Sequence, residues 1–145
     1  MKLQDMIAMN TGLPAGMTGR KMKWDEVKAP FSILKAAIIS SKQYNDNGEL
    51  LVFSKGARQG EPIYDRQLVL QIDLEGKVVI VRTTSRYLVS LFSGNLDRPA
   101  DGQNKFGDDY HFVDAPEGKM KFWAHEYVYK DGTRGMLADL EEVEE

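Results

Sequence analysis

The alternation of apolar and polar residues is most regular between residues 67 and 82, where it predicts a β-hairpin. Every second residue of the first strand is apolar, so one face is expected to pack on a core: Leu68, Leu70, Ile72 and Leu74. The opposite face carries Gln67, Val69, Gln71 and Asp73. Glu75 and Gly76 are suited to the turn, and the β-branched residues of 77–82 predict the second strand.

A second hairpin is predicted closer to the N-terminus. Residues 31–44 are apolar and β-branched enough to form a long strand. Residues 45–48 read Asn-Asp-Asn-Gly, which tolerates positive φ and predicts a turn, and residues 50–53 then form a partner strand. Two glycines and a proline in residues 54–62 indicate a mobile loop.

The remaining segments predict little helix and several more strands. Residues 2–10 have apolar residues at helical spacing, and a glycine-rich loop follows at 11–19. Ser85 is expected to cap a short helix that buries Leu88, Leu91 and Phe92 and ends at Gly94. After an exposed loop at residues 95–109, strands are predicted at 110–113, 119–129 and 133–138. This order favours a mainly β fold, a small antiparallel barrel, over a parallel α/β sheet.

The strand at residues 119–129 gives the clearest indication of a binding surface. Alternation places basic and aromatic side chains together on one face: Lys119, Lys121, Trp123, His125, Tyr127 and Tyr129. The other face is better suited to the core, with Met120, Phe122, Ala124 and Val128. Ammonium groups beside flat rings suit single-stranded nucleic acid, because they attract its phosphates and stack on its bases. The alternative is that the rings pack against another strand of the barrel.

Two other regions carry candidate binding residues. Arg82, Arg86 and Tyr87 lie where a predicted strand meets the short helix, and guanidinium groups there could hold a phosphate. Cations and rings also flank the loop at residues 54–62 and could clamp a strand, although solvated surface charges are the alternative in both regions. The residues expected to contact nucleic acid are Lys42, Tyr44, Phe53, Lys55, Arg58, Tyr64, Arg66, Arg82, Arg86, Lys119, Lys121, Trp123, Tyr127 and Tyr129.

Composition limits the class of protein. The chain has 145 residues, 42% of them hydrophobic, which suits one globular domain. It contains no Cys, so a disulfide framework, a thiolate nucleophile and a Cys-ligated zinc are excluded, and a cytoplasmic location is expected. The sequence has neither a long apolar run that would span a membrane nor the apolar segment of a secretory signal at its N-terminus.

Charge is distributed unevenly along the chain. The net charge is −3, but the last seven residues contain five acids: Asp139, Glu141, Glu142, Glu144 and Glu145. Removing these five negative charges from −3 leaves +2 for residues 1–138, so the body could meet a phosphate backbone. Residues 139–145 have too few apolar side chains to offset the entropy of ordering, which predicts a flexible acidic tail.

Enzymatic functions have less support. The glycine-containing motifs of serine hydrolases, P-loop enzymes and dinucleotide-binding proteins are missing. The residue types that ligate metals cluster only at Asp108, Asp109 and His111 with His125 and Glu126, and their spacing matches no metal motif. We therefore expect a non-catalytic protein without cofactor or metal; a metal-dependent enzyme built on this cluster is a weaker alternative.

A family resemblance rests on four segments that follow one another in the chain. They are Phe31-Ser32-Ile33, Ser41-Lys42-Gln43-Tyr44, Gln71-Ile72, and the run from Val79 to Ser85 with Leu88. In this order they resemble small phage-encoded single-stranded DNA-binding proteins of the OB-fold type, over residues 28–130.

The resemblance implies an OB-like antiparallel β-barrel at residues 20–138, preceded by a helix and loop at 1–19 and followed by the acidic tail at 139–145. It implies binding of single-stranded DNA during replication or recombination in a bacterial host cell, possible homo-oligomers, and recruitment of replication or recombination proteins by the tail. The alternative is a phage-encoded inhibitor or interaction domain that binds a host protein through its acidic surface.

Overall fold

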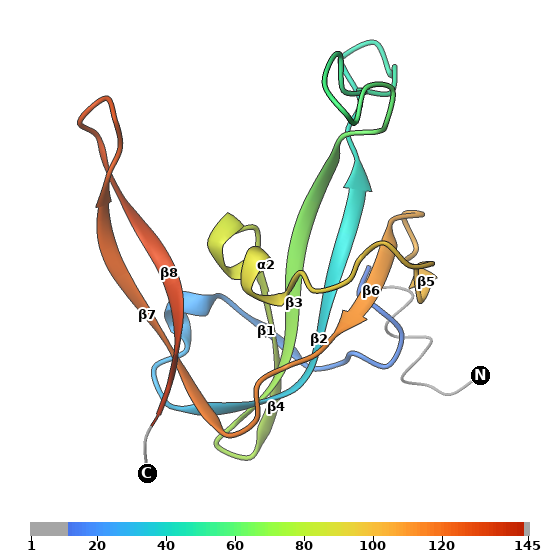
Figure 1. The fold of residues 1–145 in the computed structure, drawn as a ribbon. Helices are drawn as coiled ribbons and strands as arrows, with labels where there is room; N and C mark the ends of the chain where they lie inside the picture. The colour runs from blue at the N-terminus through green and yellow to red at the C-terminus, as the bar shows by residue number, and fades with distance from the viewer. Residues whose placement is uncertain (1–11, 144–145) are drawn as a thin grey trace.

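One long strand, β2 (Phe31–Lys42), organises the sheet. Along one side it pairs antiparallel with β3 (Tyr64–Leu74). Along the other side it pairs first with β7 (Lys119–Val128), at Phe31 and Ser32, and then with β6 (Asp109–Val113), from Ala36 to Ser40. The computed structural model describes residues 12–143, and Figure 1 shows how β2 joins the two parts of the sheet.

The other strands extend this sheet at its edges. The hairpin partner of β3 is β4 (Lys77–Thr83), which also pairs in parallel with β1 (Arg20–Met22). A two-residue strand, β5 (Gly102–Gln103), pairs with β6, and β8 (Arg134–Glu142) pairs with β7. Residues 12–143 are mainly β: a sheet curled into a half-barrel, with a short α-helix, α2 (Arg86–Phe92), on its concave side (Figure 1).

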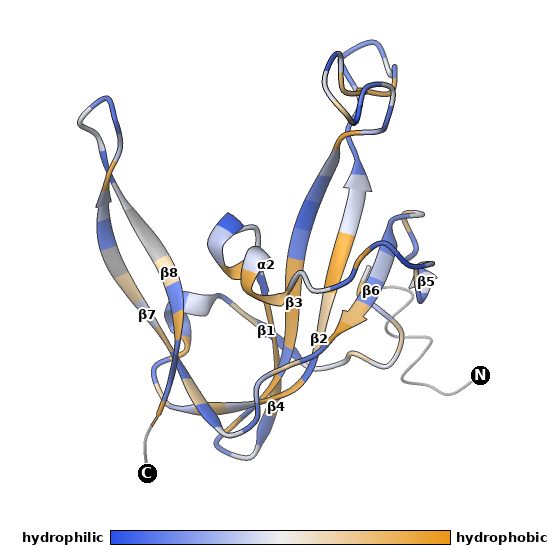
Figure 2. Ribbon diagram, in the orientation of Figure 1, coloured by the Kyte–Doolittle hydropathy of each residue, from blue (hydrophilic) through white to orange (hydrophobic). Residues whose placement is uncertain are grey.

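The concave side of the sheet holds the larger core. Alternate residues of β2, β3 and β4 point into it, which is why strands with period-2 patterns form here. A single-turn helix, η1 (Trp24–Glu26), packs against this core through Trp24. The rings of Trp24 and Phe122 lie 6.5 Å apart, edge to face. Figure 2 shows that β2 and β3 are hydrophobic over this core and become hydrophilic beyond it.

The convex side is also buried, which the sequence pattern did not predict. Val69 is fully buried and Gln71 is 8% exposed, although both were expected on a polar face. Residues 12–19 cover this side and insert Leu13 and Met17 among residues of β2, β3, β4 and β6. The amide of Gln71 donates a hydrogen bond of 2.9 Å to the carbonyl oxygen of Thr18, which satisfies its polar group.

The turn predicted between β3 and β4 and the serine cap predicted for the short helix are both confirmed. Glu75 (φ 53°) and Gly76 (φ 84°) form the turn between β3 and β4 with positive φ at both positions. The Ser85 hydroxyl accepts a hydrogen bond from the N–H of Leu88, as a cap should. The expectation for Leu91 is wrong, because 51% of this residue is exposed; Val89 is buried in its place.

Both ends of the chain differ in part from expectation. The last strand continues to Glu142, so residues 139–142, assigned above to a flexible tail, are paired with β7. Leu140 supports this extension because it packs against the concave core. The helix expected at residues 2–10 and the last two residues lie outside the described part of the chain. No helix in residues 12–143 is long and apolar enough to cross a membrane.

Candidate nucleic-acid interface

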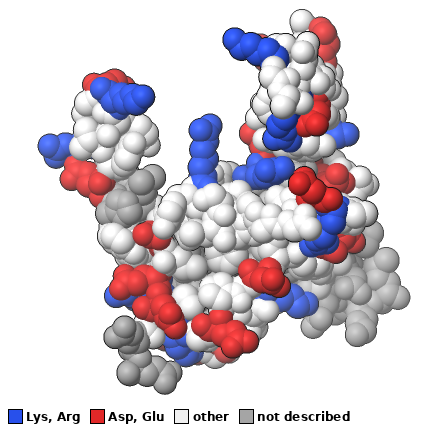
Figure 3. Space-filling view, in the orientation of Figure 1, with Lys and Arg blue, Asp and Glu red and all other residues white. Residues whose placement is uncertain are grey.

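Two arms rise from the sheet on either side of α2 (Figure 1). The β2–β3 arm comprises residues 42–64, the end of β2, the start of β3 and the long connection between them. The β7–β8 arm comprises residues 126–136, the end of that hairpin. Figure 3 shows a hollow between the arms, with blue side chains on its floor and both blue and red side chains at the tips. We name this hollow the inter-arm cleft.

The β2–β3 arm is built from three short backbone segments. The turn expected at residues 45–48 is present, with Gly48 at φ 78° and its N–H donating to the carbonyl of Asn45. Residues 50–53 lie between the other two segments, because Leu51 donates to the carbonyl of Gln43 and accepts from the N–H of Ile63. They form isolated bridges rather than the continuous strand predicted from the sequence. The segment expected as a mobile loop, residues 54–62, is also hydrogen-bonded: the N–H of Gly60 donates to the carbonyl of Phe53, and the N–H of Phe53 donates to the carbonyl of Glu61.

The face of this arm that continues the concave side of the sheet is aromatic and basic. Lys42 pairs with Tyr64, two positions beyond the pair of Ser40 and Arg66, so all four side chains share the face of the concave core residue Leu68. Tyr44 follows Lys42 by two residues, and it is 59% exposed. Its bridge partner Leu50 and the following Val52 extend the same face by the same alternation.

The other wall of the cleft is formed by α2 and the β7–β8 arm. A cavity of about 680 Å³ lies between them, lined by Trp24, Thr83, Thr84, Ser85, Arg86, Tyr87, Tyr127, Tyr129 and Ala138. The rings of Tyr127 and Tyr129 are 5.1 Å apart at an angle of 83°, an edge-to-face arrangement. Tyr87, Tyr127 and Tyr129 are each nearly half exposed, so their rings are accessible to a flat ligand.

Three exposed cations lie on the two walls of the cleft, and one of them, Arg86, lines the cavity together with the tyrosines. They are Lys42 at the base of the β2–β3 arm, Arg66 in β3 just outside the arm, and Arg86 at the start of α2. None of the three forms an ion pair with any residue of the described part of the chain. Each therefore keeps its donors available for an anion in the cleft.

Arg82 does not share this surface with Arg86. It pairs with Val69 and lies on the convex side of the sheet, where its guanidinium group donates two hydrogen bonds to Oε1 of Gln67. Burial lowers the pKa of Arg82 from its ordinary value. The sequence placed both arginines beside the short helix, but strand alternation turns Arg82 to the other face.

Some residues of the β2–β3 arm that were expected to bind nucleic acid instead contact other residues of the same arm. Arg58 pairs with Glu61 at 2.8 Å and lies over the ring of Phe53, 5.0 Å from its centroid. Phe53 itself is half-buried, whereas Lys55 is exposed. Arg58 and Phe53 thus stabilise the arm, and Tyr44 and Tyr64 are better placed to meet a ligand.

The face predicted on residues 119–129 is divided between two places. Lys119 and Lys121 lie at the base of β7, and Lys121 stands opposite Glu141. Trp123 is 40% exposed and stands opposite Asp139, whereas Tyr127 and Tyr129 are at the tip and line the cavity. Two-stranded ribbons twist strongly, so residues that alternate along one strand do not keep facing one direction.

The cluster of residue types that ligate metals is not assembled. His111 is 7% exposed on β6, and its Nε2 lies 3.0 Å from the carbonyl oxygen of Arg98. Glu126 forms an ion pair with Arg134 on the β7–β8 arm instead. Among the described side chains of residues 12–143, to which that of His125 does not belong, no group of three or more acidic or histidine residues is arranged to hold a metal ion.

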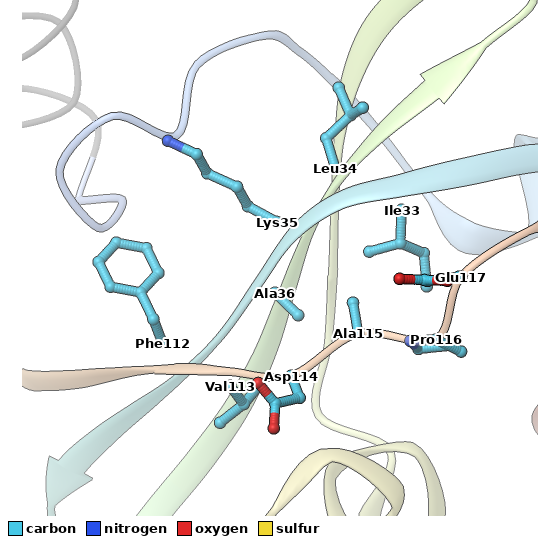
Figure 4. A pocket seen from close by; sticks show the side chains of 10 residues that line it. All are labelled: Ile33, Leu34, Lys35, Ala36, Phe112, Val113, Asp114, Ala115, Pro116 and Glu117. Atoms are coloured by element: carbon cyan, nitrogen blue, oxygen red, sulfur yellow. The ribbon is translucent and has the colours of Figure 1, made fainter.

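A second hollow lies beside β2, where the strand has a bulge between Ile33 and Lys35. This groove of about 490 Å³ is bordered by residues 33–36 and 112–117 (Figure 4). In Figure 4 the Lys35 side chain extends away from Asp114 and Glu117, so carboxylates dominate the polar part of the groove. That charge disfavours a phosphate, and the inter-arm cleft is the better candidate for nucleic acid.

Comparison with known proteins gives no relative from which a function could be carried over. No protein-family model, no curated protein and no solved structure matches the chain. The interpretation of the inter-arm cleft therefore rests on its residues and geometry.

Proposed function

We propose that the protein is a non-catalytic single-stranded DNA-binding protein and that the inter-arm cleft is its binding surface. One observation carries the proposal: segments far apart in the sequence bring exposed tyrosines and unpaired cations to the same side of the sheet. Rings stack on bases of any sequence, and lysine and arginine attract the phosphates, so this combination suits an unpaired strand.

In this proposal the strand crosses the floor of the cleft between the two arms. Arg66 and Arg86 contact its phosphates, and its bases stack on Tyr64, Tyr127 and Tyr129. Each stacked base contributes about 1–3 kcal/mol, so a few rings suffice for micromolar binding together with the charge attraction.

The half-barrel supports a finer proposal about the fold. The three antiparallel strands β2, β3 and β4, the short helix α2 and the hairpin of β7 and β8, with β2 shared between both parts of the sheet, suit an OB-type barrel with an open seam; β1, β5 and β6 are additional to that pattern. A role in phage or bacterial replication or recombination follows only from the family resemblance, and we propose it on that basis.

Binding of a fluorescently labelled, unstructured oligonucleotide, measured by anisotropy at two salt concentrations, tests this function. The double variant Arg66→Gln/Arg86→Gln should bind more weakly, and the slope of log affinity against log salt should fall by about 0.7 for each lost phosphate contact. Lys21→Gln/Lys23→Gln is the matched control, because these exposed lysines lie at β1, outside the cleft. Absence of binding at about 50 mM salt would refute the proposal.

A further inference from the structure

The β2–β3 arm exposes aliphatic side chains in addition to its tyrosines. Base stacking requires aromatic rings and does not explain these aliphatic residues. Leu50 is 40% exposed and Val52 is 44% exposed, and both lie on the face that carries Tyr44. Exposed leucine and valine side chains are individually common on proteins, but these two are separated by one residue and share the face of the arm that continues the concave side of the sheet. Their position calls for a ligand group that is itself apolar.

The aliphatic wall is held in a fixed shape. Leu50 forms a β-bridge with Tyr44, and Val52 forms a β-bridge with Pro62. Each of the two residues therefore has a fixed partner on a neighbouring segment of the arm. Leu51, between them, bonds through its backbone to Gln43 on one side and to Ile63 on the other. A ligand group that contacts the wall therefore meets a surface that is already formed and loses little free energy in ordering it.

Cations lie on the same face of β2 and β3 as the wall, nearer the sheet. Lys42 lies two residues before Tyr44 on the same face, and Arg66 lies two residues after Tyr64. A ligand that is anionic at the cations and apolar at Leu50 and Val52 would complement this face. Within a DNA strand, only thymine carries an apolar substituent on its base, the C5 methyl group.

We propose that the wall formed by Leu50 and Val52 recognises the C5 methyl group of thymine. The inter-arm cleft would then prefer thymine-containing single strands over otherwise identical strands with uracil. The inference rests on the proposed function, and it extends that function from any unpaired strand to a preferred base.

Oligomers of deoxythymidine and deoxyuridine of equal length provide the test, because they share the sugar and differ only in the methyl group. We expect tighter binding of the thymine oligomer by about fourfold for each methyl group that becomes fully buried. The variant Leu50→Gln/Val52→Gln should bind both oligomers with the affinity of the uracil oligomer. Leu34→Gln, at a leucine 49% exposed on the β2 bulge, is the control and should keep the preference.

The outcomes separate this inference from the function on which it rests. Binding of neither oligomer would overturn both. Equal binding of the two oligomers by the unaltered protein would overturn the thymine preference and leave strand binding intact. A preference that persists in Leu50→Gln/Val52→Gln, with unchanged melting temperature, would show that the methyl group is read elsewhere. Loss of self-association in that variant, measured by sedimentation, together with an unchanged oligomer ratio, would assign the wall to a protein contact instead.

Discussion

Two arginines that are four residues apart in the sequence lie on opposite faces of the sheet and should respond differently to substitution. Arg86 lines the cavity of the inter-arm cleft, whereas Arg82 is bonded to Gln67 on the convex side. We expect Arg86→Gln to weaken oligonucleotide binding several-fold without changing the melting temperature. Arg82→Gln should leave binding unchanged and lower the free energy of unfolding by about 1 kcal/mol. Anisotropy and thermal melting of both variants check this; the reverse pattern would mean that Arg82 holds the phosphate.

Asp101 gives the protein a specific response to acid. Its pKa is lowered, first by the hydrogen bond from Arg98 and then by the N–H of Phe112, so the carboxylate is favoured in the folded state. The stability that it contributes is present above the ordinary Asp pKa of about 3.9 and is lost as the pH falls through the lowered value. Asp101→Asn should therefore flatten the fall in melting temperature between about pH 4 and pH 2. Asp97→Asn, an exposed neighbour in the same loop, should not flatten it.

The turn between β3 and β4 contains a residue in an unfavourable backbone conformation. Glu75 has φ 53°, a region that costs most L-residues roughly 1 kcal/mol and that asparagine tolerates better. Glu75→Asn should therefore raise the free energy of unfolding by about 0.5–1 kcal/mol in denaturant titrations. Glu75→Gln is the control for loss of charge, and an equal gain in that variant would show that the backbone conformation is not the cause.

At the scale of elements, β8 combines an acidic sequence with a structural role. Residues 139–142 pair with β7, and Leu140 reaches the concave core. Deleting residues 139–145 should lower the free energy of unfolding by about 1–2 kcal/mol, the contribution of a half-buried leucine. Deleting residues 143–145 should have little effect, because it leaves β8 complete. Neutralising Asp139, Glu141 and Glu142 without shortening the chain separates charge from length; a similar loss in that variant would contradict the packing explanation.

The sequence predicts elements well where local signals decide the structure. The hairpin of β3 and β4, the long β2 and the cap of α2 all depend on alternation, turn residues and a capping serine, which act within a few residues. Prediction from the sequence fails where packing against a distant segment determines which residues are buried. Val69 and Gln71 alternate as a polar face would, and only the packing of residues 12–19 explains why they are buried.

The same distinction applies to the candidate site. The tyrosines and cations were identifiable by residue type, but which of them share a surface depends on strand alternation and ribbon twist. Leu50 and Val52 were not identified, since an apolar run next to a turn predicts a strand and not a binding wall. The pairing of Tyr44 with Leu50 across residues 45–48 is the signal that could have placed them on one face.

At the scale of the molecule, the β2–β3 arm should be separable from the fold. Replacing residues 44–62 by Asn-Gly would join Gln43 to Ile63, which already exchange a backbone hydrogen bond. Because the shorter connection costs less closure entropy, we expect the melting temperature to fall little or not at all. Oligonucleotide affinity should fall by about tenfold, since Tyr44 and the aliphatic wall are removed. An unchanged affinity would exclude the arm from the binding surface.

Both faces of the sheet are covered by packed side chains, and this should slow the exchange of its central amide protons with solvent. The N–H groups at the centre of β3 are shielded by the concave core and by residues 12–19, so they should exchange with solvent only when the whole domain unfolds. The arms lack such cover, and their N–H groups should exchange through small local openings. The arms, which we propose to bind the strand, can therefore open locally while the centre of the sheet stays folded.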